Sequence, residues 1–128
     1  MSFITEKQVQ RILVVDDVKD NLFLAQFILE TEGYEVDTAE NGEAAIAKIK
    51  TETPKPNLIV LDIMMPRMDG YEVIHCLRQL NLSYIPILLM TADTNVSYQK
   101  AIDSGADGLI YKPIDLKQFL TKVEMFNP

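Results

Sequence analysis

The chain has 128 residues, of which 48% are hydrophobic and 24% are charged, and it carries a formal net charge of −7 and one cysteine, Cys76. This length suits one domain with a hydrophobic core, and the negative charge argues against sequence-independent nucleic-acid binding, which needs a basic face. A single cysteine cannot form an internal disulfide and fits a reducing cytoplasm. No apolar run is long enough for a membrane-spanning helix. Residues 1–10 predict a short polar extension, which is followed by one domain at 11–126.

Strand and helix patterns alternate along the chain, starting with an apolar run at 11–15 that predicts a strand covered on both faces. A helix follows at 20–31, because apolar residues recur there with helical spacing. These residues are Leu22, Phe23, Ala25, Phe27 and Leu29. The next strand, at 34–40, alternates apolar and acidic residues, which predicts an edge strand with one wetter face.

The same alternation continues through the rest of the domain. Continuous apolar runs predict three more strands, at 57–61, 86–90 and 108–111, and amphipathic stretches predict helices at 42–51, 70–80, 94–104 and 115–126. The stretch 94–104 has the weakest apolar stripe, so we expect it to be the least tightly held. Five strand–helix units of this kind predict a doubly wound parallel sheet between two layers of helices, a three-layer α/β/α fold.

In such sheets the functional site lies beyond the carboxyl ends of the strands, so the residues that follow each strand are the first candidates. They are Asp16 and Asp17 after the first strand, Asp62 after the third, Thr91 and Ala92 after the fourth, and Lys112 and Pro113 after the fifth. If these strand ends converge, the three carboxylates lie close together. Two carboxylates about 4 Å apart repel each other by about 4 kcal/mol at an effective dielectric near 20. Such a cluster needs a cation or protons. Lys112 supplies one positive charge, and an all-oxygen ligand set that leaves room for water suits Mg²⁺ or Mn²⁺.

Four segments carry a family resemblance: LVVDD at 13–17, IVLDIMMPRMDG at 59–70, ILLMTA at 87–92 and GADGLIYKPI at 105–114. In this order and at strand ends, they closely resemble the receiver domain of bacterial response regulators. The resemblance implies a flavodoxin-like (βα)5 fold with strand order 2-1-3-4-5. It also implies a cytoplasmic two-component signalling domain rather than an enzyme that turns over an external substrate.

The resemblance further implies a phosphoryl-acceptor site. Asp62 would attack the phosphohistidine of a sensor histidine kinase or a histidine phosphotransfer domain, giving an acyl phosphate. Asp17 and Asp62 would bind Mg²⁺ directly and Asp16 mainly through water, with the backbone carbonyl of Met64 as a further ligand. The remaining roles are those of donors to the phosphoryl oxygens, namely Thr91, the backbone N–H of Ala92 and Lys112, and of structural residues, namely Pro66, Gly70 and a cis Pro113.

Signal output is expected as a population shift, in which the phosphoryl group pulls Thr91 inward and the segment 92–104 follows. Many receivers carry an aromatic ring three residues before the lysine. This chain has Leu109 at that position and places Tyr111 two residues later, on the same strand face. Either Tyr111 substitutes for that ring, or the ring switch is absent.

Two surfaces are expected to bind partners. The fourth helix, the fifth strand and the fifth helix would form an output face for a downstream protein, an output domain or a second copy of the chain in a phosphorylation-dependent homodimer. The first helix and the loop before it would bind the kinase, with Val18, Asn21 and Leu22 as candidate contacts.

Other interpretations stay open at this point. A Mg²⁺-dependent phosphohydrolase with an aspartyl nucleophile shares the chemistry, but it usually resembles Asp-x-Asp after the first strand, whereas this chain has Val18 there. A flavodoxin-type cofactor carrier shares the fold, but the acidic sequence DDVKD at 16–20 would repel a phosphate. A degenerate receiver used only for docking is a further alternative. Asp20 and Asp69 are interpreted as helix caps.

Overall fold

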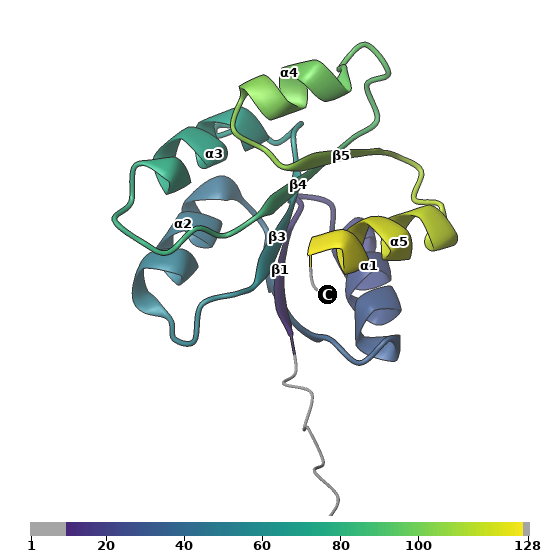
Figure 1. Ribbon diagram of the computed structural model, residues 1–128, viewed down its shortest axis with the longest axis horizontal. Helices are drawn as coiled ribbons and strands as arrows, with labels where there is room; N and C mark the ends of the chain where they lie inside the picture. The colour runs from purple at the N-terminus through teal and green to yellow at the C-terminus, as the bar shows by residue number, and fades with distance from the viewer. Residues whose placement is uncertain (1–9, 127–128) are drawn as a thin grey trace, which may run out of the picture.

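The computed structural model describes residues 10–126, so the predicted polar extension, apart from Gln10, lies outside the described residues. Strands and helices alternate throughout this part of the chain (Figure 1). They are β1 Arg11–Val15, α1 Lys19–Thr31, β2 Glu35–Ala39, α2 Gly42–Thr51, β3 Leu58–Asp62, α3 Gly70–Arg78, β4 Ile87–Thr91, α4 Tyr98–Asp103, β5 Gly108–Tyr111 and α5 Leu116–Phe126. Within residues 10–126, no helix is both long and apolar enough to cross a membrane.

The five strands form one parallel sheet in the order β2-β1-β3-β4-β5, which confirms the flavodoxin-like arrangement that the sequence resemblance implied. Figure 1 shows α1 and α5 on one side of the sheet and α2, α3 and α4 on the other. The strand order reverses beside β1, which pairs with β2 on one edge and with β3 on the other. A crevice at the carboxyl ends of β1 and β3 is therefore the expected ligand position for this topology.

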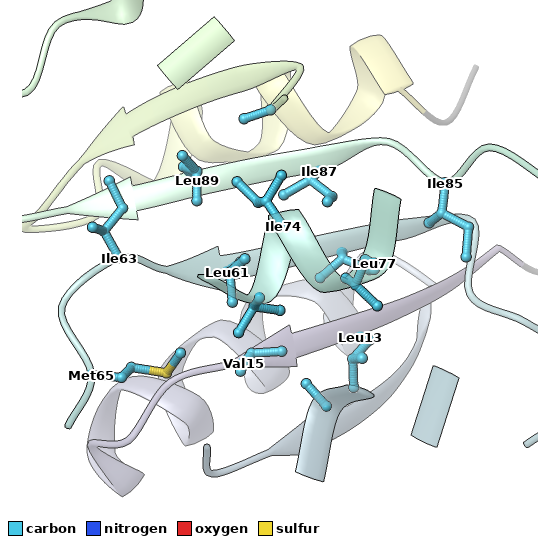
Figure 2. Packing of buried hydrophobic residues seen from close by; sticks show 14 of the residues in the cluster. Leu13, Val15, Leu61, Ile63, Met65, Ile74, Leu77, Ile85, Ile87 and Leu89 are labelled. Atoms are coloured by element: carbon cyan, nitrogen blue, oxygen red, sulfur yellow. The ribbon is translucent and has the colours of Figure 1, made fainter. Parts of the chain in front are cut away.

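Two apolar clusters cover the two faces of the sheet. On one face, Ile74 and Leu77 of α3 pack over Leu61 of β3 and Ile87 and Leu89 of β4 (Figure 2). On the other face, α1 and α5 contribute fully buried side chains to the second cluster, namely Leu29, Phe119 and Val123, which pack with buried residues of the strands. Every residue of β3 and of β4 is buried, as the continuous apolar runs predicted.

The first helix differs from the expectation in which residues it buries. Leu22, Ala25 and Leu29 are buried against the sheet, but the side chains of Phe23 and Phe27 are 65% and 71% exposed. Successive helical positions point about 100° apart, so the two phenylalanines form a second stripe that faces away from the core. Helical spacing shows that two apolar stripes exist, but it does not show which one faces the sheet.

The N-terminal ends of two helices, α1 and α4, also differ from the sequence predictions. Asp20 was expected to cap α1, but the N-cap position is Val18, without a side-chain cap bond, and Asp20 lies in the first turn of the helix. Helix α4 is shorter than the predicted 94–104, because its first turn is capped by Ser97, whose Oγ accepts a hydrogen bond from the N–H of Lys100 at 3.0 Å. The interpretation of Asp69 is confirmed, since it caps α3 in a reciprocal capping box with Glu72.

Gly70, at the start of α3, packs directly against the end of β3. A Cβ atom at this position would lie 2.7 Å from the carbonyl oxygen of Asp62 and 2.8 Å from the Cα of Ile63. The N–H of Gly70 also donates to the carbonyl of Ile63 at 2.8 Å. Because these neighbours are backbone atoms, a side chain here would displace the end of β3, where Asp62 lies.

We therefore expect Gly70→Ala to destabilise the protein by about 1–3 kcal/mol, the usual effect of forcing extra atoms into a packed region. Gly42→Ala is the matched control, because Gly42 also opens a helix but its added Cβ would meet side-chain atoms of Met68 and Val73, which can move. Urea unfolding at equilibrium measures both changes. An equal loss in the two variants would contradict the role assigned to the close backbone contact.

Candidate functional site

Three aspartates meet at the carboxyl edge of the sheet. Val15 of β1 pairs with Leu61 of β3, so the next residues, Asp16 and Asp62, lie side by side beyond this pair. Carboxylate oxygens of Asp16, Asp17 and Asp62 all lie within 4.8 Å of one another. Asp16 and Asp62 are almost completely buried, at 0% and 4% exposure, whereas Asp17 is more open to solvent. The parallel register of β1 and β3 thus builds the cluster.

Lys112, the residue that follows β5, contacts this acidic cluster. Its Nζ donates to Asp16 Oδ2 at 2.8 Å and lies 3.3 Å from Asp62 Oδ1. The backbone N–H of Lys112 donates to the carbonyl of Thr91 at 2.8 Å, which ties the end of β5 to β4. The peptide bond between Lys112 and Pro113 is cis. One ammonium group therefore contacts two of the three carboxylates.

Asp16 is further held by the turn that follows β1. Its Oδ1 accepts a hydrogen bond from the N–H of Val18 at 2.9 Å, while its own N–H donates to the carbonyl of Ala39 at 3.2 Å. Sequence reasoning missed the first of these bonds, although Asp two residues before an N–H is a common turn arrangement. Asp16 thus combines a local turn bond with the long-range ion pair to Lys112.

The remaining predicted site residues line the loops around the cluster. Thr91 is fully buried at the end of β4, and its Oγ1 accepts a hydrogen bond from the N–H of Asp93 at 3.0 Å. Ala92 is exposed immediately after it. The side chain of Met64 is 65% exposed, so it takes no part in the core. Pro66 lies in the same loop, where its carbonyl accepts from the N–H of Met68 at 2.8 Å.

Burial and like charges dominate the electrostatics of Asp62. Burial, together with the charge of Asp16, raises the pKa of Asp62 from 3.8 to about 6, against the opposing effect of Lys112. Burial by itself would lower the pKa of Lys112, but its hydrogen bond to Asp16 and the charge of Asp62 outweigh burial and raise that pKa. Asp62 therefore ionises at a higher pH than an ordinary aspartate, and Lys112 keeps its proton.

The donor set fits a hard divalent cation. Three carboxylates face one ammonium group, which leaves two negative charges unbalanced when all groups are ionised. Oxygen-only ligands with one side open to solvent are typical of Mg²⁺ sites, where the ion keeps several waters. The residues that can hold such an ion are therefore Asp16, Asp17 and Asp62.

The surface of α1 corrects one sequence prediction. Leu22 was expected among the exposed kinase contacts, but its side chain is only 4% exposed because it packs into the second apolar cluster. Val18 is 47% exposed, in line with its predicted place on the surface. The exposed apolar residues of α1 itself are Phe23, Leu24 and Phe27. The aromatic pair four positions apart, Phe23 and Phe27, was the sequence signal for a second apolar stripe, although it did not show that this stripe is exposed.

The strand order and the acidic cluster place the protein in one class, the flavodoxin-like α/β domains with an acidic site where the strand order reverses. Within that class, the chain belongs to the family of response regulator receiver domains, whose family model matches residues 12–124. Response regulators interact with histidine kinases and output domains, and receiver domains generally bind Mg²⁺ through an acidic pocket.

Proteins with similar sequences or structures support the same family assignment. The alkaline phosphatase synthesis transcriptional regulatory protein PhoP of Bacillus subtilis is 43% identical over 116 residues, which cover 90% of this chain and 47% of that protein. The response regulator PleD of Caulobacter vibrioides is 41% identical over 107 residues, or 82% of this chain and 23% of that protein. The chemotaxis protein CheY4 of Vibrio cholerae superposes with a TM-score of 0.82 at 30% identity, over 93% of this chain and 99% of that one. The chain thus spans half or less of the length of these two sequence relatives.

The raised pKa of Asp62 yields a stability prediction in the absence of metal. Because its folded pKa of about 6 exceeds its ordinary value of 3.8, ionised Asp62 costs stability above pH 6, and this cost disappears as the pH falls toward 3.8. In EDTA above pH 6, Asp62→Asn should therefore stabilise the fold by about 1–2 kcal/mol, a discounted value for a group that keeps a lysine partner.

Thermal unfolding of both proteins in EDTA across this pH range measures the difference, which should shrink as the pH falls below 6. Adding Mg²⁺ should stabilise the wild type more than Asp62→Asn, since binding to the folded state adds stability. Asp103→Asn, an exposed change on α4, serves as the control and should show neither effect. A wild type that stays as stable as Asp62→Asn at every pH would contradict the repulsion.

Proposed function

We propose that Asp62 is a phosphoryl acceptor of a two-component signalling pathway. The observation that carries this proposal is the position of Asp62, a nearly buried carboxylate that contacts Lys112 and lies among two further acids. A carboxylate oxygen of Asp62 attacks the phosphorus of a phosphohistidine, the P–N bond breaks, and the histidine nitrogen leaves with the bonding electron pair. The product is an acyl phosphate on Asp62.

The groups around Asp62 have separate tasks in this transfer. Asp16, Asp17, Asp62 and the carbonyl of Met64 would hold Mg²⁺ or Mn²⁺, which supplies positive charge for the transferred phosphoryl group when it is bound. Lys112 pairs with a phosphoryl oxygen in place of a carboxylate. The remaining donors are the hydroxyl of Thr91 and the N–H of Ala92. Positioning and charge neutralisation then carry most of the reaction.

The domain acts, on this proposal, as a cytoplasmic switch rather than as an enzyme with an external substrate, limited to its own phosphorylation and dephosphorylation. Its output face comprises α4, β5 and α5. Exposed apolar residues on these elements, Tyr98, Tyr111 and Leu116, support a contact with protein. The contact would be made with a downstream protein, an output domain or a second copy of the chain after phosphorylation.

The phosphoryl donor docks on α1, on the same side as the acidic site. Val18, at the end of the loop that carries Asp16 and Asp17, leads into the exposed stripe of Phe23, Leu24 and Phe27. An amphipathic helix of the kinase or phosphotransfer domain would pack on this stripe and bring its phosphohistidine to the edge of the sheet.

Incubation with Mg²⁺ and acetyl phosphate tests the acceptor. The wild type should gain one phosphoryl group that is stable in acid and labile in base, and intact mass measurement should detect it. Asp62→Asn should gain none, whereas Asp103→Asn should be labelled like the wild type, because Asp103 lies on α4 outside the acidic cluster.

Any other outcome of the labelling experiment would assign a different function to the protein or a different residue as acceptor. A phosphoryl group that persists in Asp62→Asn would place the acceptor elsewhere. Continuous release of phosphate from an external ester by the wild type would favour the hydrolase alternative. No labelling of the wild type at any Mg²⁺ concentration would favour a docking domain that is not phosphorylated.

Phe27→Ala tests the docking stripe. A histidine phosphotransfer domain that phosphorylates the wild type should phosphorylate this variant about ten-fold more slowly, the effect of losing one aromatic contact at an interface. Labelling by acetyl phosphate should not change, because Phe27 lies on α1 outside the acidic cluster. Met125→Ala, which removes a similarly exposed apolar side chain from α5, is the matched control. If both variants slow equally, α1 is not the docking surface.

A further inference from the structure

A cavity of about 440 Å³ lies at the amino ends of β1 and β2. It is lined by the first residues of these strands, by residues at the ends of α1 and α2, and by the loop between α2 and β3. Because the strands are parallel, this edge of the sheet is opposite to the edge that carries the acidic site. The volume falls within the range of about 300–1,000 Å³ that is typical of small-molecule pockets.

The floor of the cavity is apolar. Leu13 of β1 and Ile49 of α2 are each 2% exposed, and they belong to the apolar cluster that α2 and α3 form with the sheet. Pro54 and Pro56, from the loop before β3, add further apolar surface. A methylene chain placed on these side chains would be removed from water, which favours binding.

Two basic residues that line the cavity are paired with carboxylates. Arg11 Nη2 lies 2.8 Å from Glu35 Oε2. Lys48 Nζ lies 3.0 Å from Asp37 Oδ1 and 3.7 Å from Glu52 Oε1. Glu35 and Asp37 are two positions apart on β2, so both side chains point to the same face of the sheet. Three carboxylates therefore share two cations.

A fourth carboxylate, that of Glu30 on α1, lines the same cavity. Among residues 10–126, the ion pairs of this region join Arg11 to Glu35 and Lys48 to Asp37 and Glu52, and none includes Glu30. Four carboxylates thus face two cations, which leaves two negative charges unbalanced when all groups are ionised.

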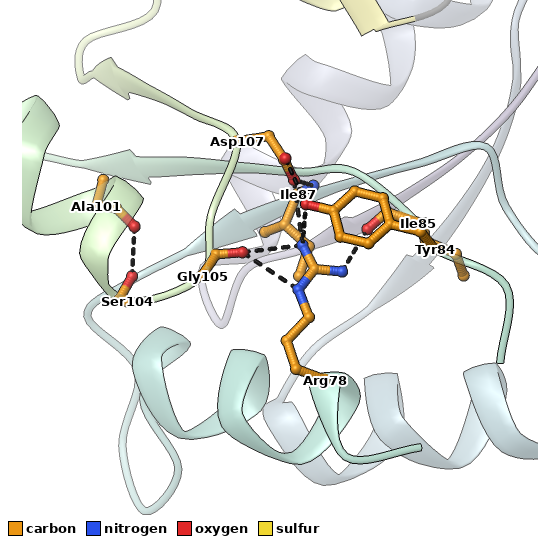
Figure 3. A network of polar contacts seen from close by, with 8 residues as sticks. All are labelled: Arg78, Tyr84, Ile85, Ile87, Ala101, Ser104, Gly105 and Asp107. Atoms are coloured by element: carbon orange, nitrogen blue, oxygen red, sulfur yellow. Dashed lines mark hydrogen bonds and ion pairs between the residues drawn. The ribbon is translucent and has the colours of Figure 1, made fainter. Parts of the chain in front are cut away.

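The ion pair at Arg78 shows the opposite arrangement (Figure 3). Its guanidinium group meets one carboxylate, that of Asp107, at 3.1 Å. Its other bonds include those to the carbonyls of Gly105 at 2.9 Å and of Ile85 at 2.7 Å. One cation balances one anion there, so an excess charge that could attract a ligand is found at the cavity and not at Arg78.

Ion pairing keeps two of the groups in the cavity charged. Burial by itself would raise the pKa of Asp37, but the hydrogen bond from Lys48 outweighs burial and lowers that pKa. The same hydrogen bond raises the pKa of Lys48 against the opposing effect of burial. Asp37 and Lys48 therefore both stay ionised at neutral pH, and the lysine neutralises only one of its two carboxylate neighbours.

The end of α1 adds negative charge to the same cavity. The carbonyl groups at a helix C-terminus carry a partial negative charge, which basic residues near that end stabilise. Helix α1 has no basic residue in its last turn, where it carries Glu30, and Glu32 follows at the C-cap. Burial, together with the charges of Glu124 and Glu32, raises the pKa of Tyr34, which also lines the cavity. The helix end thus favours a cation independently of the ion pairs.

The spacing of the carboxylates favours an extended organic cation over a metal ion. Within residues 10–126, Asp16, Asp17 and Asp62 are the one group of three acidic side chains close enough together to hold a single ion. The carboxylates of the cavity are distributed around an apolar floor instead. A matching ligand carries separate positive charges that are joined by methylene groups.

We propose that this cavity binds a linear aliphatic polyamine. Its methylene chain lies on Leu13, Ile49 and the two prolines, and its ammonium groups pair with the carboxylates that the protein leaves unbalanced, chiefly Glu30 and Glu52. The site is remote from Asp62 and does not depend on the phosphoryl transfer proposed above.

Titration of the metal-free protein with spermidine, followed through the backbone amide NMR signals, tests the site. Signals of residues that line the cavity, in β1, in β2 and at the end of α2, should shift together and saturate at low salt. Binding should weaken as added salt screens the charges. Glu30→Gln and Glu52→Gln should each weaken binding about three-fold, the effect of losing one exposed ion pair.

Glu43→Gln is the matched control. It removes the same charge from the first turn of α2, outside the cavity, and should bind spermidine like the wild type. If this variant weakens binding as much as Glu30→Gln and Glu52→Gln, the amine responds to the net charge of the protein and the proposed site is wrong.

Two simpler amines test the ligand class. Putrescine has two ammonium groups on a four-carbon chain, and n-butylamine has the same chain with one. Putrescine should bind about five-fold more tightly, because n-butylamine loses one exposed ion pair. Equal binding of the two amines would contradict the match to two unbalanced charges.

Two further results would overturn the proposal. Spermidine shifts confined to the loops around Asp62, and removed by saturating Mg²⁺, would show that the amine is only a counter-ion of the acidic site. A lysine-containing peptide that shifts the cavity signals at lower concentration than spermidine would assign the cavity to a protein partner. Shifts at the cavity that persist in saturating Mg²⁺ would support the polyamine site.

Discussion

The contact of Lys112 with Asp16 and Asp62 is the interaction on which the architecture of the site depends. It joins residues that are 96 positions apart, and it forms only if β1, β3 and β5 end at the same edge of one parallel sheet. The lysine balances part of the negative charge, so the cluster can exist in the folded protein. Burial and the unbalanced charge together raise the pKa of Asp62, and a bound cation can relieve the repulsion.

The fold followed from the sequence because local patterns and topology agree. Buried parallel strands are continuous apolar runs, and each predicted strand lies within one residue of the observed one at either end. The residues after the strands were predicted to meet because parallel strands present their carboxyl ends at one edge, and Asp16, Asp17 and Asp62 do meet there. That prediction needed no knowledge of side-chain geometry.

Other features could not be predicted, because they depend on partners distant in sequence or on orientation. Spacing along α1 did not show that Leu22 faces the core and Phe27 faces solvent. The Asp107 of the GAD segment gave no sign of its partner Arg78, which lies 29 residues earlier. Nor did the sequence show that the hydroxyl of Tyr111 reaches Val96, since strand alternation fixes the face of a side chain but not the atom it bonds.

The acidic site and α4 are connected by a short series of bonds. Thr91 ends β4 beside the cluster, its carbonyl accepts from the N–H of Lys112, and its hydroxyl accepts from the N–H of Asp93. Tyr111 precedes Lys112 and bonds the carbonyl of Val96. Lys112, which contacts Asp62, and Thr91, which bonds the N–H of Lys112, therefore connect the acidic site to the segment that leads into α4. The segment before α4 is held at this point by the hydroxyl bonds of Thr91 and Tyr111 and by the side chain of Val96, which is buried in the first apolar cluster.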